Sequence, residues 1–270
     1  GRCEGFYGIY GVPKEHTQEF EEFVHQLEEV ELAKNVRLFW STCLHSVNLT
    51  KNWFDPKSKA WIFHWEKWME EIPSMETKLP YTLVEPEDFP VKADYIDARI
   101  LAKLEINSTT SFREIAKVLN MTSEAVAYHY KHHILKRGLL EKSQVFFPRF
   151  DKTTSDFSVF IFRFDEKDKM AQFALSLLNK PFVYALGKIL NENALIAHVY
   201  LPRKEFRRFI YSLSELIKRG RLQTYEYVIE DFDVNNAQTI SYEYFKDGSW
   251  IYDHKKHMES LQNLARNLKC

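Results

Sequence analysis

Basic and hydroxyl side chains are frequent between residues 111 and 142. Lysine and arginine neutralise phosphates, and Ser and Tyr hydroxyls bond phosphate oxygens, so these residue types together favour a nucleic-acid partner. The basic and hydroxyl residues concerned are Arg113, Lys117, Ser123, Tyr128, Lys131, Lys136, Arg137 and Lys142.

The charge distribution supports nucleic acid as a partner for this segment alone. The whole chain carries a net charge of −1, but residues 92–150 hold ten Lys and Arg against six Asp and Glu, a net of +4. Residues 1–91 are acidic, with nine Lys and Arg against sixteen Asp and Glu. A charge of +4 is modest, so a solvated mixed surface is the alternative interpretation on charge alone.

Three short helical patterns would position these side chains. Residues 95–105 repeat apolar side chains at helical spacing, and Ser111 with Glu114 forms a capping box for a second helix. Thr122 and Ser123 can cap a third helix, which Gly138 ends. The third helix buries Val126, Tyr130 and Ile134, so the candidate residues 123, 124, 127, 128 and 131 fall on its other side. Leu139-Leu140 and Val145–Phe147 alternate like a small hairpin, or wing, which completes a winged helix-turn-helix plan.

Four stretches of this segment resemble the DNA-binding domain of the leucine-responsive regulator (Lrp/AsnC) family. They are Asp97–Leu101, Ser111–Leu119, Thr122–Val126 and Lys136–Leu140, and the run Val126–His133 resembles an archaeal branch of such regulators. The resemblance implies a transcription regulator that binds double-stranded DNA as a homodimer, with its third helix in the major groove. It also implies that Ser123, Glu124, Ala127, Tyr128 and Lys131 face the DNA from that helix, and that Arg113, Lys117, Lys136, Arg137 and Lys142 contact the backbone. There Lys131 could neutralise phosphate or read guanine, whereas Glu124 would either accept a hydrogen bond from cytosine or repel the backbone. Members often sense an amino acid in a loop with Gly and Asp. The comparable loop, residues 186–193, has one Gly and no Asp, so any small-molecule effector stays unidentified.

Residues 157–232 predict the order strand, helix, strand, strand, helix, strand, which is the split βαβ or ferredoxin-like order. The expected strands are 157–164, 182–190, 194–201 and 222–232, and the expected helices are 167–179 and 203–219. In the Lrp/AsnC resemblance this segment is a regulatory and dimerisation domain. The predicted fold class is therefore α+β.

An internal repeat relates residues 5–72 to residues 194–261. Trp61-Ile62-Phe63 aligns with Trp250-Ile251-Tyr252, and Met69-Glu70 aligns with Met258-Glu259. The repeat predicts strands at 5–12 and 36–47 around a helix at 14–32, which is the second half of a ferredoxin-like unit. We expect the first half of that unit upstream of Gly1 or on a partner chain.

The expected organisation is a central winged helix-turn-helix with ferredoxin-like domains on both sides, the N-terminal one incomplete. The expected boundaries are 1–72 for the partial unit, 73–93 for a Pro-rich linker, 94–150 for the DNA-binding domain and 151–270 for the regulatory domain with its aromatic tail.

The sequence gives little support for a metal site, an enzyme active site or a surface that stacks nucleobases. His129 and His133 stand four residues apart, as two metal ligands on one helix face would, but no third ligand follows at metal spacing. We therefore predict no metal site. The sequence has no phosphate loop, nucleophile elbow or zincin motif, so we also predict no enzyme activity, no catalytic residue and no cofactor. Trp61, Trp65 and Trp68 favour core packing over a platform for nucleobases.

Three scattered cysteines and the lack of a long apolar stretch indicate a reduced, cytoplasmic protein with no membrane partner. Two alternatives to a DNA-binding regulator stay open. The first is a non-enzymatic adaptor, in which the acidic aromatic region recruits a protein and the winged helix no longer binds DNA. The second is an RNA-binding protein that uses the same basic face.

Overall fold

The computed structural model describes residues 5–46, 51–85, 92–140, 149–231 and 240–269 as a mixed α/β structure. The chain divides into two compact units, each built from separate stretches of sequence. The helical unit takes residues 1–38, 88–145 and 236–270, and the sheet unit takes residues 39–87 and 146–235. These units differ from the expected boundaries, because the described residues of 39–85 group with the sheet, and those of 240–269 group with the N-terminal helix and the central helices.

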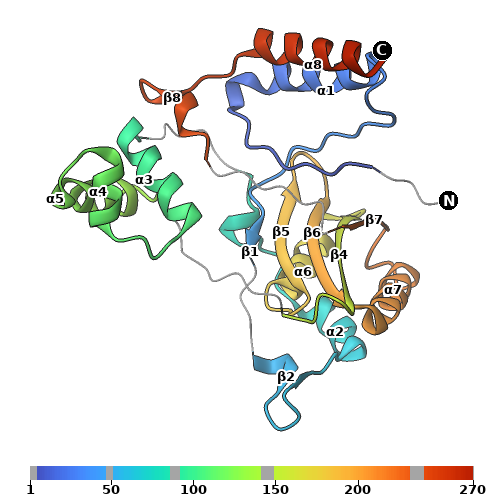
Figure 1. The fold of residues 1–270 in the computed structure, drawn as a ribbon. Helices are drawn as coiled ribbons and strands as arrows, with labels where there is room; N and C mark the ends of the chain where they lie inside the picture. The colour runs from blue at the N-terminus through green and yellow to red at the C-terminus, as the bar shows by residue number, and fades with distance from the viewer. Residues whose placement is uncertain (1–4, 47–50, 86–91, 141–148, 232–239, 270) are drawn as a thin grey trace. The chain divides into compact units, whose positions relative to one another are not determined.

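A five-stranded antiparallel sheet organises the sheet unit (Figure 1). Its main elements are β4 (Ser155–Arg163), α6 (Lys167–Leu177), β5 (Val183–Ile189), β6 (Ala194–Pro202), α7 (Arg203–Lys218) and β7 (Thr224–Glu230). This order of elements confirms the prediction for residues 157–232. The strands lie in the order β1–β5–β6–β4–β7, and β4 pairs with β6 along nine residues, from Ser155 opposite Pro202 to Arg163 opposite Ala194.

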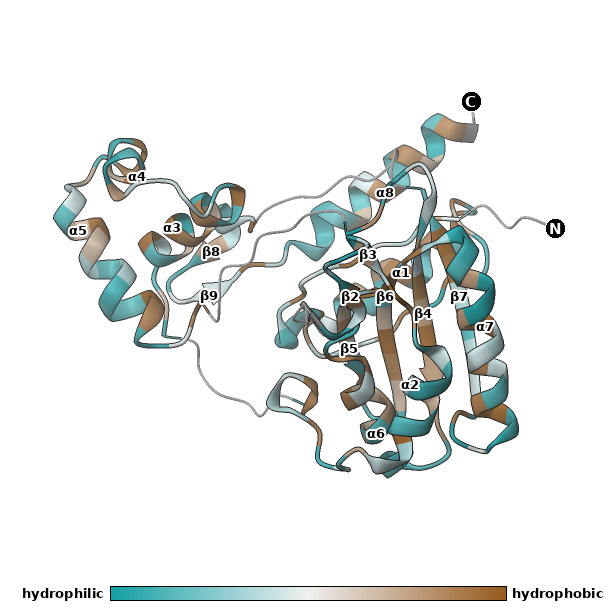
Figure 2. Cartoon of the chain, turned by 90° about the horizontal axis from the view of Figure 1, so that it is seen from below, coloured by the Kyte–Doolittle hydropathy of each residue, from teal (hydrophilic) through white to brown (hydrophobic). Residues whose placement is uncertain are grey.

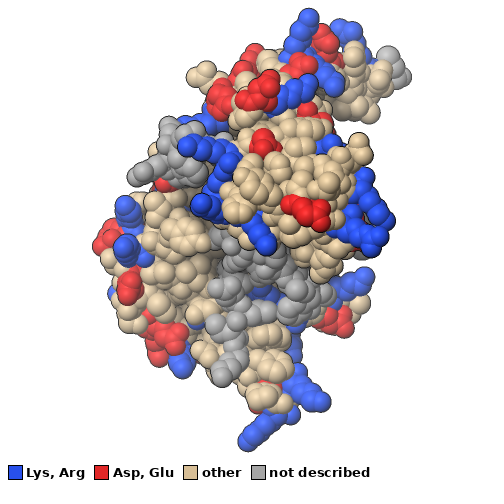
Figure 3. All heavy atoms as spheres, turned by 90° about the vertical axis from the view of Figure 1, so that its left-hand side faces the viewer, with Lys and Arg blue, Asp and Glu red and all other residues tan. Residues whose placement is uncertain are grey.

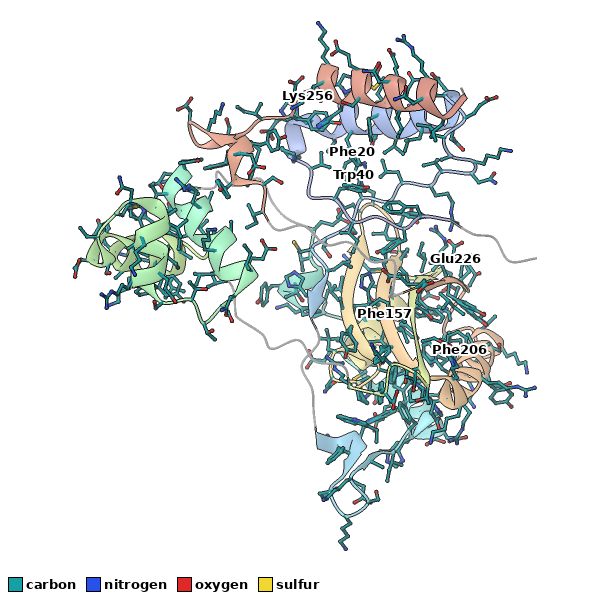
Figure 4. The ribbon with its side chains drawn as sticks, viewed as in Figure 1. Phe20, Trp40, Phe157, Phe206, Glu226 and Lys256 are labelled. Carbon is teal, nitrogen blue, oxygen red and sulfur yellow. The ribbon has the colours of Figure 1, made fainter. Side chains whose placement is uncertain are left out.

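Aromatic side chains join one face of this sheet to α6 and α7. Phe160 and Phe162 of β4 are fully buried and stacked, with ring centres 5.4 Å apart. Phe209 of α7 lies 5.3 Å from Phe160, and Phe173 of α6 lies 4.9 Å from Phe162. Much of β4 and β6 is coloured as hydrophobic in Figure 2, and Figure 4 shows Phe206 on α7 beside the sheet. Each buried Phe stabilises the fold by about 1.5–3 kcal/mol.

The short helix α2 (Trp65–Glu71) adds two tryptophans to the same core. Trp65 and Trp68 are 1% and 0% exposed. The indole Nε1 of Trp65 donates to Glu205 Oε2 at 2.9 Å, and that of Trp68 donates to Ser176 Oγ at 3.1 Å. Both indole N–H groups thus have the hydrogen-bond partner that burial requires. These two tryptophans are core residues, as predicted, and present no open platform for a base.

The Pro-rich segment is not a free linker over its described part, residues 73–85. It forms the short helices η3 (Ile72–Ser74) and η4 (Tyr81–Leu83), and Ile72 and Leu83 are 1% and 0% exposed in the core. Gln172 of α6 donates to the carbonyls of Pro73 and Met75. The linker prediction was wrong here because apolar residues between the prolines enter the core; residues 86–91 lie outside the described residues.

Of the strand expected at 36–47, the described residues form only the two-residue strand β1 (His45–Ser46), which pairs with β5 at the sheet edge. Thr42 N–H donates to Lys188 O at 2.8 Å, and Leu190 N–H donates to Trp40 O at 2.8 Å. Gly187 permits this approach, since a Cβ there would lie 3.1 Å from Thr42 O and 3.0 Å from the Leu44 side chain. Residues 186–193, the loop that was compared with the amino-acid-binding loop of Lrp/AsnC regulators, are thus covered by residues 40–44 of the same chain.

In the helical unit, α1 (Thr17–Glu29) packs against α8 (His254–Lys269), and both helices lie side by side in Figure 1. Figure 4 shows Phe20 on the opposite side of α1 from α8, and its ring lies 5.5 Å from Tyr10. The helix at 14–32 is confirmed, but the strand predicted at 5–12 is wrong. Residues 5–12 are apolar but adopt no strand conformation in the structure.

A hairpin followed by a helix occurs twice, at the two places that the sequence repeat aligns. One hairpin joins β2 (Phe54–Asp55) to β3 (Ala60–Trp61) and precedes α2; the other joins β8 (Phe245–Lys246) to β9 (Ser249–Trp250) and precedes α8. Phe54 pairs with Trp61, and Phe245 pairs with Trp250. The two hairpins therefore share a local layout, but the described residues around α1 do not form the expected strand–helix–strand frame, and the duplication stays a prediction.

Among the helices of the described segments, none combines the length and apolar composition that a bilayer crossing requires.

Candidate nucleic-acid interface

Three helices of the helical unit carry the candidate DNA contacts. They are α3 (Tyr95–Ile106), α4 (Phe112–Leu119) and α5 (Ser123–Tyr128), and the π-helix η5 (His129–Leu135) continues α5 without a break. A small apolar cluster holds them together. Its buried members are Ile100, Ile115, Ala116, Leu119, Val126 and Ile134.

Capping interactions fix the turn between α4 and α5. The Ser111 N–H donates to Glu114 Oε2 at 2.9 Å, and the Glu114 N–H donates to Ser111 Oγ at 3.3 Å. Hydrogen bonds from Ser111 lower the pKa of the Glu114 carboxyl. Asn120 takes the left-handed conformation (φ 54°), and Thr122 Oγ1 accepts from the Ala125 N–H at 3.1 Å. The predicted capping of both helices is confirmed.

The third helix has one buried side and one exposed side, as its sequence predicts. Val126 and Ile134 are 0% exposed. On the other side Glu124, Tyr128 and Lys131 are exposed, and Ser123 and Ala127 are half-buried. The Tyr128 ring is 56% exposed and lies 4.7 Å from the His132 ring. This side therefore presents an aromatic ring, a cation and a carboxylate to solvent.

Three flanking cations are also exposed: Arg113 and Lys117 on α4, and Lys136 after η5. Figure 3 looks onto the side of Figure 1 where α4 and α5 lie, and Lys and Arg atoms border a mostly uncharged face there. Arg137 is engaged within the chain, because its guanidinium donates to Lys92 O at 2.6 Å. Lys142 and Val145–Phe147, the predicted wing, lie outside the described residues.

A polar cluster links the start of α3 to η5. Asp94 and Asp97 come from the N-terminus of α3, and His129 and His133 come from η5. Nδ1 of His129 lies 2.8 Å from Asp97 Oδ1, and Nδ1 of His133 lies 3.1 Å from the same oxygen. Asp97 is fully buried, while the two histidine side chains are each 17% exposed. The cluster thus holds the C-terminal half of the third helix against α3.

The sequence prediction missed both carboxylates of this cluster. A sequence pattern could have indicated the two aspartates: Asp94-Tyr95-Ile96-Asp97 has the spacing of a capping box at the start of an apolar helix. The structure contains that capping box. What the sequence could not supply was the pairing with His129 and His133, which lie 32 and 36 residues beyond Asp97.

Comparison with known proteins finds similarity in structure only. The sequence matches no protein-family model and no curated protein. Similar solved structures include E. coli AsnC, at 18% identity over 54% of this chain and 97% of AsnC, with a TM-score of 0.40. A transcriptional regulator from Neisseria meningitidis, solved in complex with L-Met, shows 16% identity over 55% of this chain and 96% of its own (TM-score 0.46). An AsnC family transcriptional regulator from Agrobacterium tumefaciens shows 14% identity over 56% and 99% (TM-score 0.45).

Proposed function

We propose that this chain is a DNA-binding transcription regulator of the Lrp/AsnC type. The single observation that carries the proposal is the exposed side of the third helix, where Tyr128 and Lys131 lie opposite the buried Val126 and Ile134. A helix with its side chains is about 10–12 Å wide, which fits the major groove of about 12 Å. The third helix can therefore enter the groove without disturbing the apolar cluster behind it.

The proposed contacts divide by role. Lys131 and Tyr128 reach base edges or phosphates from within the groove, and Arg113 and Lys117 of α4 reach the backbone beside it. Lys136 extends the backbone contacts beyond η5. Glu124 favours a cytosine in one orientation and otherwise repels phosphate, so it contributes to sequence choice more than to affinity.

The sheet unit serves, in this proposal, as a ferredoxin-like regulatory and dimerisation domain of a cytoplasmic homodimer. Its edge strand β7 exposes Tyr227, Val228 and Ile229 to 41%, 50% and 58%. Side chains alternate along a strand, so Tyr227 and Ile229 lie on one face and Val228 on the other, and this apolar edge strand suits pairing with a second copy. A dimer would place two third helices on half-sites about 34 Å apart. Light scattering that gives a concentration-independent mass near 32.2 kDa would contradict the dimer.

The test measures duplex DNA binding by fluorescence anisotropy across a series of salt concentrations. The Lys131→Ala/Lys136→Ala variant loses two proposed phosphate contacts, so its plot of log affinity against log salt should be less steep by about 2. The matched control is Lys204→Ala/Arg207→Ala on α7, which removes the same charge from exposed positions in the sheet unit. We expect the control to bind like the parent chain.

Equal affinity and equal salt slope in both double variants would contradict the placement of the third helix. Stronger competition by RNA than by duplex DNA would favour the RNA-binding alternative, and no salt-dependent binding to either would favour the adaptor.

A further inference from the structure

Four side chains between α3 and η5 form a ligand set that the proposed DNA contacts leave unused. They are Asp94, Asp97, His129 and His133, and one ligand atom from each lies within 4.8 Å of the other three. We propose that these residues bind one divalent transition-metal ion of the Zn²⁺ type.

The spacing of the ligand atoms approaches a tetrahedron. Nδ1 of His129 lies 2.8 Å from Asp97 Oδ1 and 3.7 Å from Asp94 Oδ2. Nδ1 of His133 lies 3.1 Å and 3.5 Å from the same two oxygens. Zinc bonds of about 2.0–2.2 Å to nitrogen and oxygen require tetrahedral edges of about 3.3–3.6 Å. These four histidine–carboxylate separations bracket that range, and all four ligand atoms lie within 4.8 Å of one another, so the side chains must draw together to complete the coordination.

Backbone hydrogen bonds orient both carboxylates toward the histidines. Asp94 Oδ1 accepts from the Asp97 N–H at 2.9 Å, and Asp97 Oδ2 accepts from the Asp94 N–H at 3.1 Å. One oxygen of each carboxylate is therefore held by the start of α3, and Asp94 Oδ2 and Asp97 Oδ1 are the oxygens that face both imidazoles. Asp97 Oδ2 also lies 3.2 Å from His133 Nδ1 and 3.8 Å from the Arg137 guanidinium. Hydrogen bonds that hold the ligands in this way are a usual part of protein metal sites.

Burial and local backbone also set this cluster apart from a surface ion pair. Asp97 is 0% exposed, and a buried carboxylate needs cationic or hydrogen-bonding partners. The Asp94 side chain is 47% exposed, which leaves the ion a path from solvent. The histidines lie on a π-helix, a rare backbone conformation that is frequent at functional sites.

The donor types restrict the ion. Two imidazole nitrogens disfavour Mg²⁺ and Ca²⁺, which prefer oxygen ligands, and the lack of a sulfur ligand in the set disfavours Cu(I). Two nitrogens and two carboxylate oxygens at tetrahedral spacing suit Zn²⁺, with Co²⁺ as a spectroscopic substitute.

A regulatory consequence rests on the proposed DNA-binding function. Tyr128 directly precedes His129, and Lys131 lies between His129 and His133, so an ion that joins η5 to α3 also fixes the helix segment that would face DNA. The ion would then act as the effector, and removing it would weaken DNA binding.

The experiment uses the full chain after treatment with a chelator. Zn²⁺ is titrated in competition with a chromophoric chelator, and Co²⁺ is added separately to record its visible absorption. We expect one ion per chain and the intense absorption of tetrahedral Co²⁺. Asp94→Asn keeps an N-cap acceptor for α3, and both it and His133→Gln should weaken Zn²⁺ binding about tenfold or more. His132→Gln, an exposed neighbour outside the cluster, is the matched control and should bind Zn²⁺ like the parent.

Absence of Zn²⁺ binding by the parent chain, or equal binding by Asp94→Asn and His132→Gln, would overturn the site and leave a hydrogen-bonded cluster only. If His133→Gln fails to fold by circular dichroism, Asp94→Asn decides the outcome. Zn²⁺ binding without any change in DNA affinity would keep the site and reject the effector role. A chain that binds Zn²⁺ but no DNA at any Zn²⁺ concentration would reject the proposed function and keep the site.

Discussion

The alignment of residues 5–72 with residues 194–261 matches α1 with α7 and α2 with α8. The pair α2–α7 and the pair α8–α1 nevertheless differ in their contacts. In the sheet unit α2 packs on α7, and Trp65 lies 5.4 Å from Phe209. In the helical unit α8 packs on α1, and His257 lies 6.1 Å from Phe23. The alignment that matches Trp61 with Trp250 also matches Trp65 with His254 and Trp68 with His257. The two tryptophans are fully buried, whereas the two histidines are half-buried.

This difference shows that the hairpin sets where the next helix starts, whereas the residues of that helix set how deeply it is buried. Both hairpins place an aromatic pair across two short strands and then start a helix. The residues at the first and fourth positions of that helix then decide its environment. Tryptophan is suited to a dry core, while histidine tolerates water and charge, and His254 Nε2 accordingly lies 3.3 Å from Glu22 Oε2.

The largest expected effect on stability comes from replacing Trp68 of α2 with histidine, the residue at the aligned position of α8. Trp68→His removes a fully buried side chain and its hydrogen bond to Ser176, so the free energy of unfolding should fall by about 3–5 kcal/mol. Urea denaturation at pH 7.5, followed by circular dichroism, measures the change. A loss below about 1 kcal/mol would show that the core around α2 is loosely packed, and the contrast with α8 would disappear.

His198, which is buried in the sheet unit, should make the free energy of unfolding depend on pH, and this effect is smaller than that of Trp68→His. Burial lowers the pKa of His198 on β6 from 6.5 to about 4. As pH falls below 6.5, the unfolded chain takes up a proton that the folded chain does not, so stability present at neutral pH is lost. From pH 7 to pH 5 the unfolding free energy should fall by about 2 kcal/mol from this group. His198→Leu should flatten that dependence; an unchanged pH profile in the variant would refute it.

The smallest effect is expected from the reverse exchange in the helical unit. His257→Trp places an indole on the half-buried surface between α8 and α1, beside Phe23 and Tyr252. With no dry core to fill, the change in unfolding free energy should stay within about 1 kcal/mol. Thermal unfolding of this variant beside Trp68→His tests the asymmetry directly. Similar losses in the two variants would mean that both helix pairs are equally buried.

Local patterns predicted the elements whose stabilising contacts lie close in sequence. Strand alternation and helical spacing gave the order of elements from β4 to β7, and Ser111 and Thr122 gave the caps of α4 and α5. The exposed side of the third helix also followed from its own periodicity, because Val126 and Ile134 mark the buried side.

Contacts between distant segments account for what the sequence could not predict. Apolar residues 5–12 are compatible with a strand, but pairing depends on a neighbour that local pattern does not reveal. The prolines of 73–85 indicated a linker, although Ile72 and Leu83 enter a core built mainly by residues 80 or more positions later. The His–Asp cluster likewise depends on how α3 packs against η5, which no spacing within either helix encodes.

The most direct test of the proposed function is selection of bound duplexes from a random DNA pool at physiological salt. We expect one enriched motif with two related half-sites about one helical turn apart, bound at least about 10³-fold more tightly than scrambled duplex. Tyr128→Ala and Lys131→Ala should lose that preference, while Lys204→Ala should keep it. A pool that shows no enrichment after repeated rounds, with folded protein throughout, would contradict sequence-specific DNA binding by this chain.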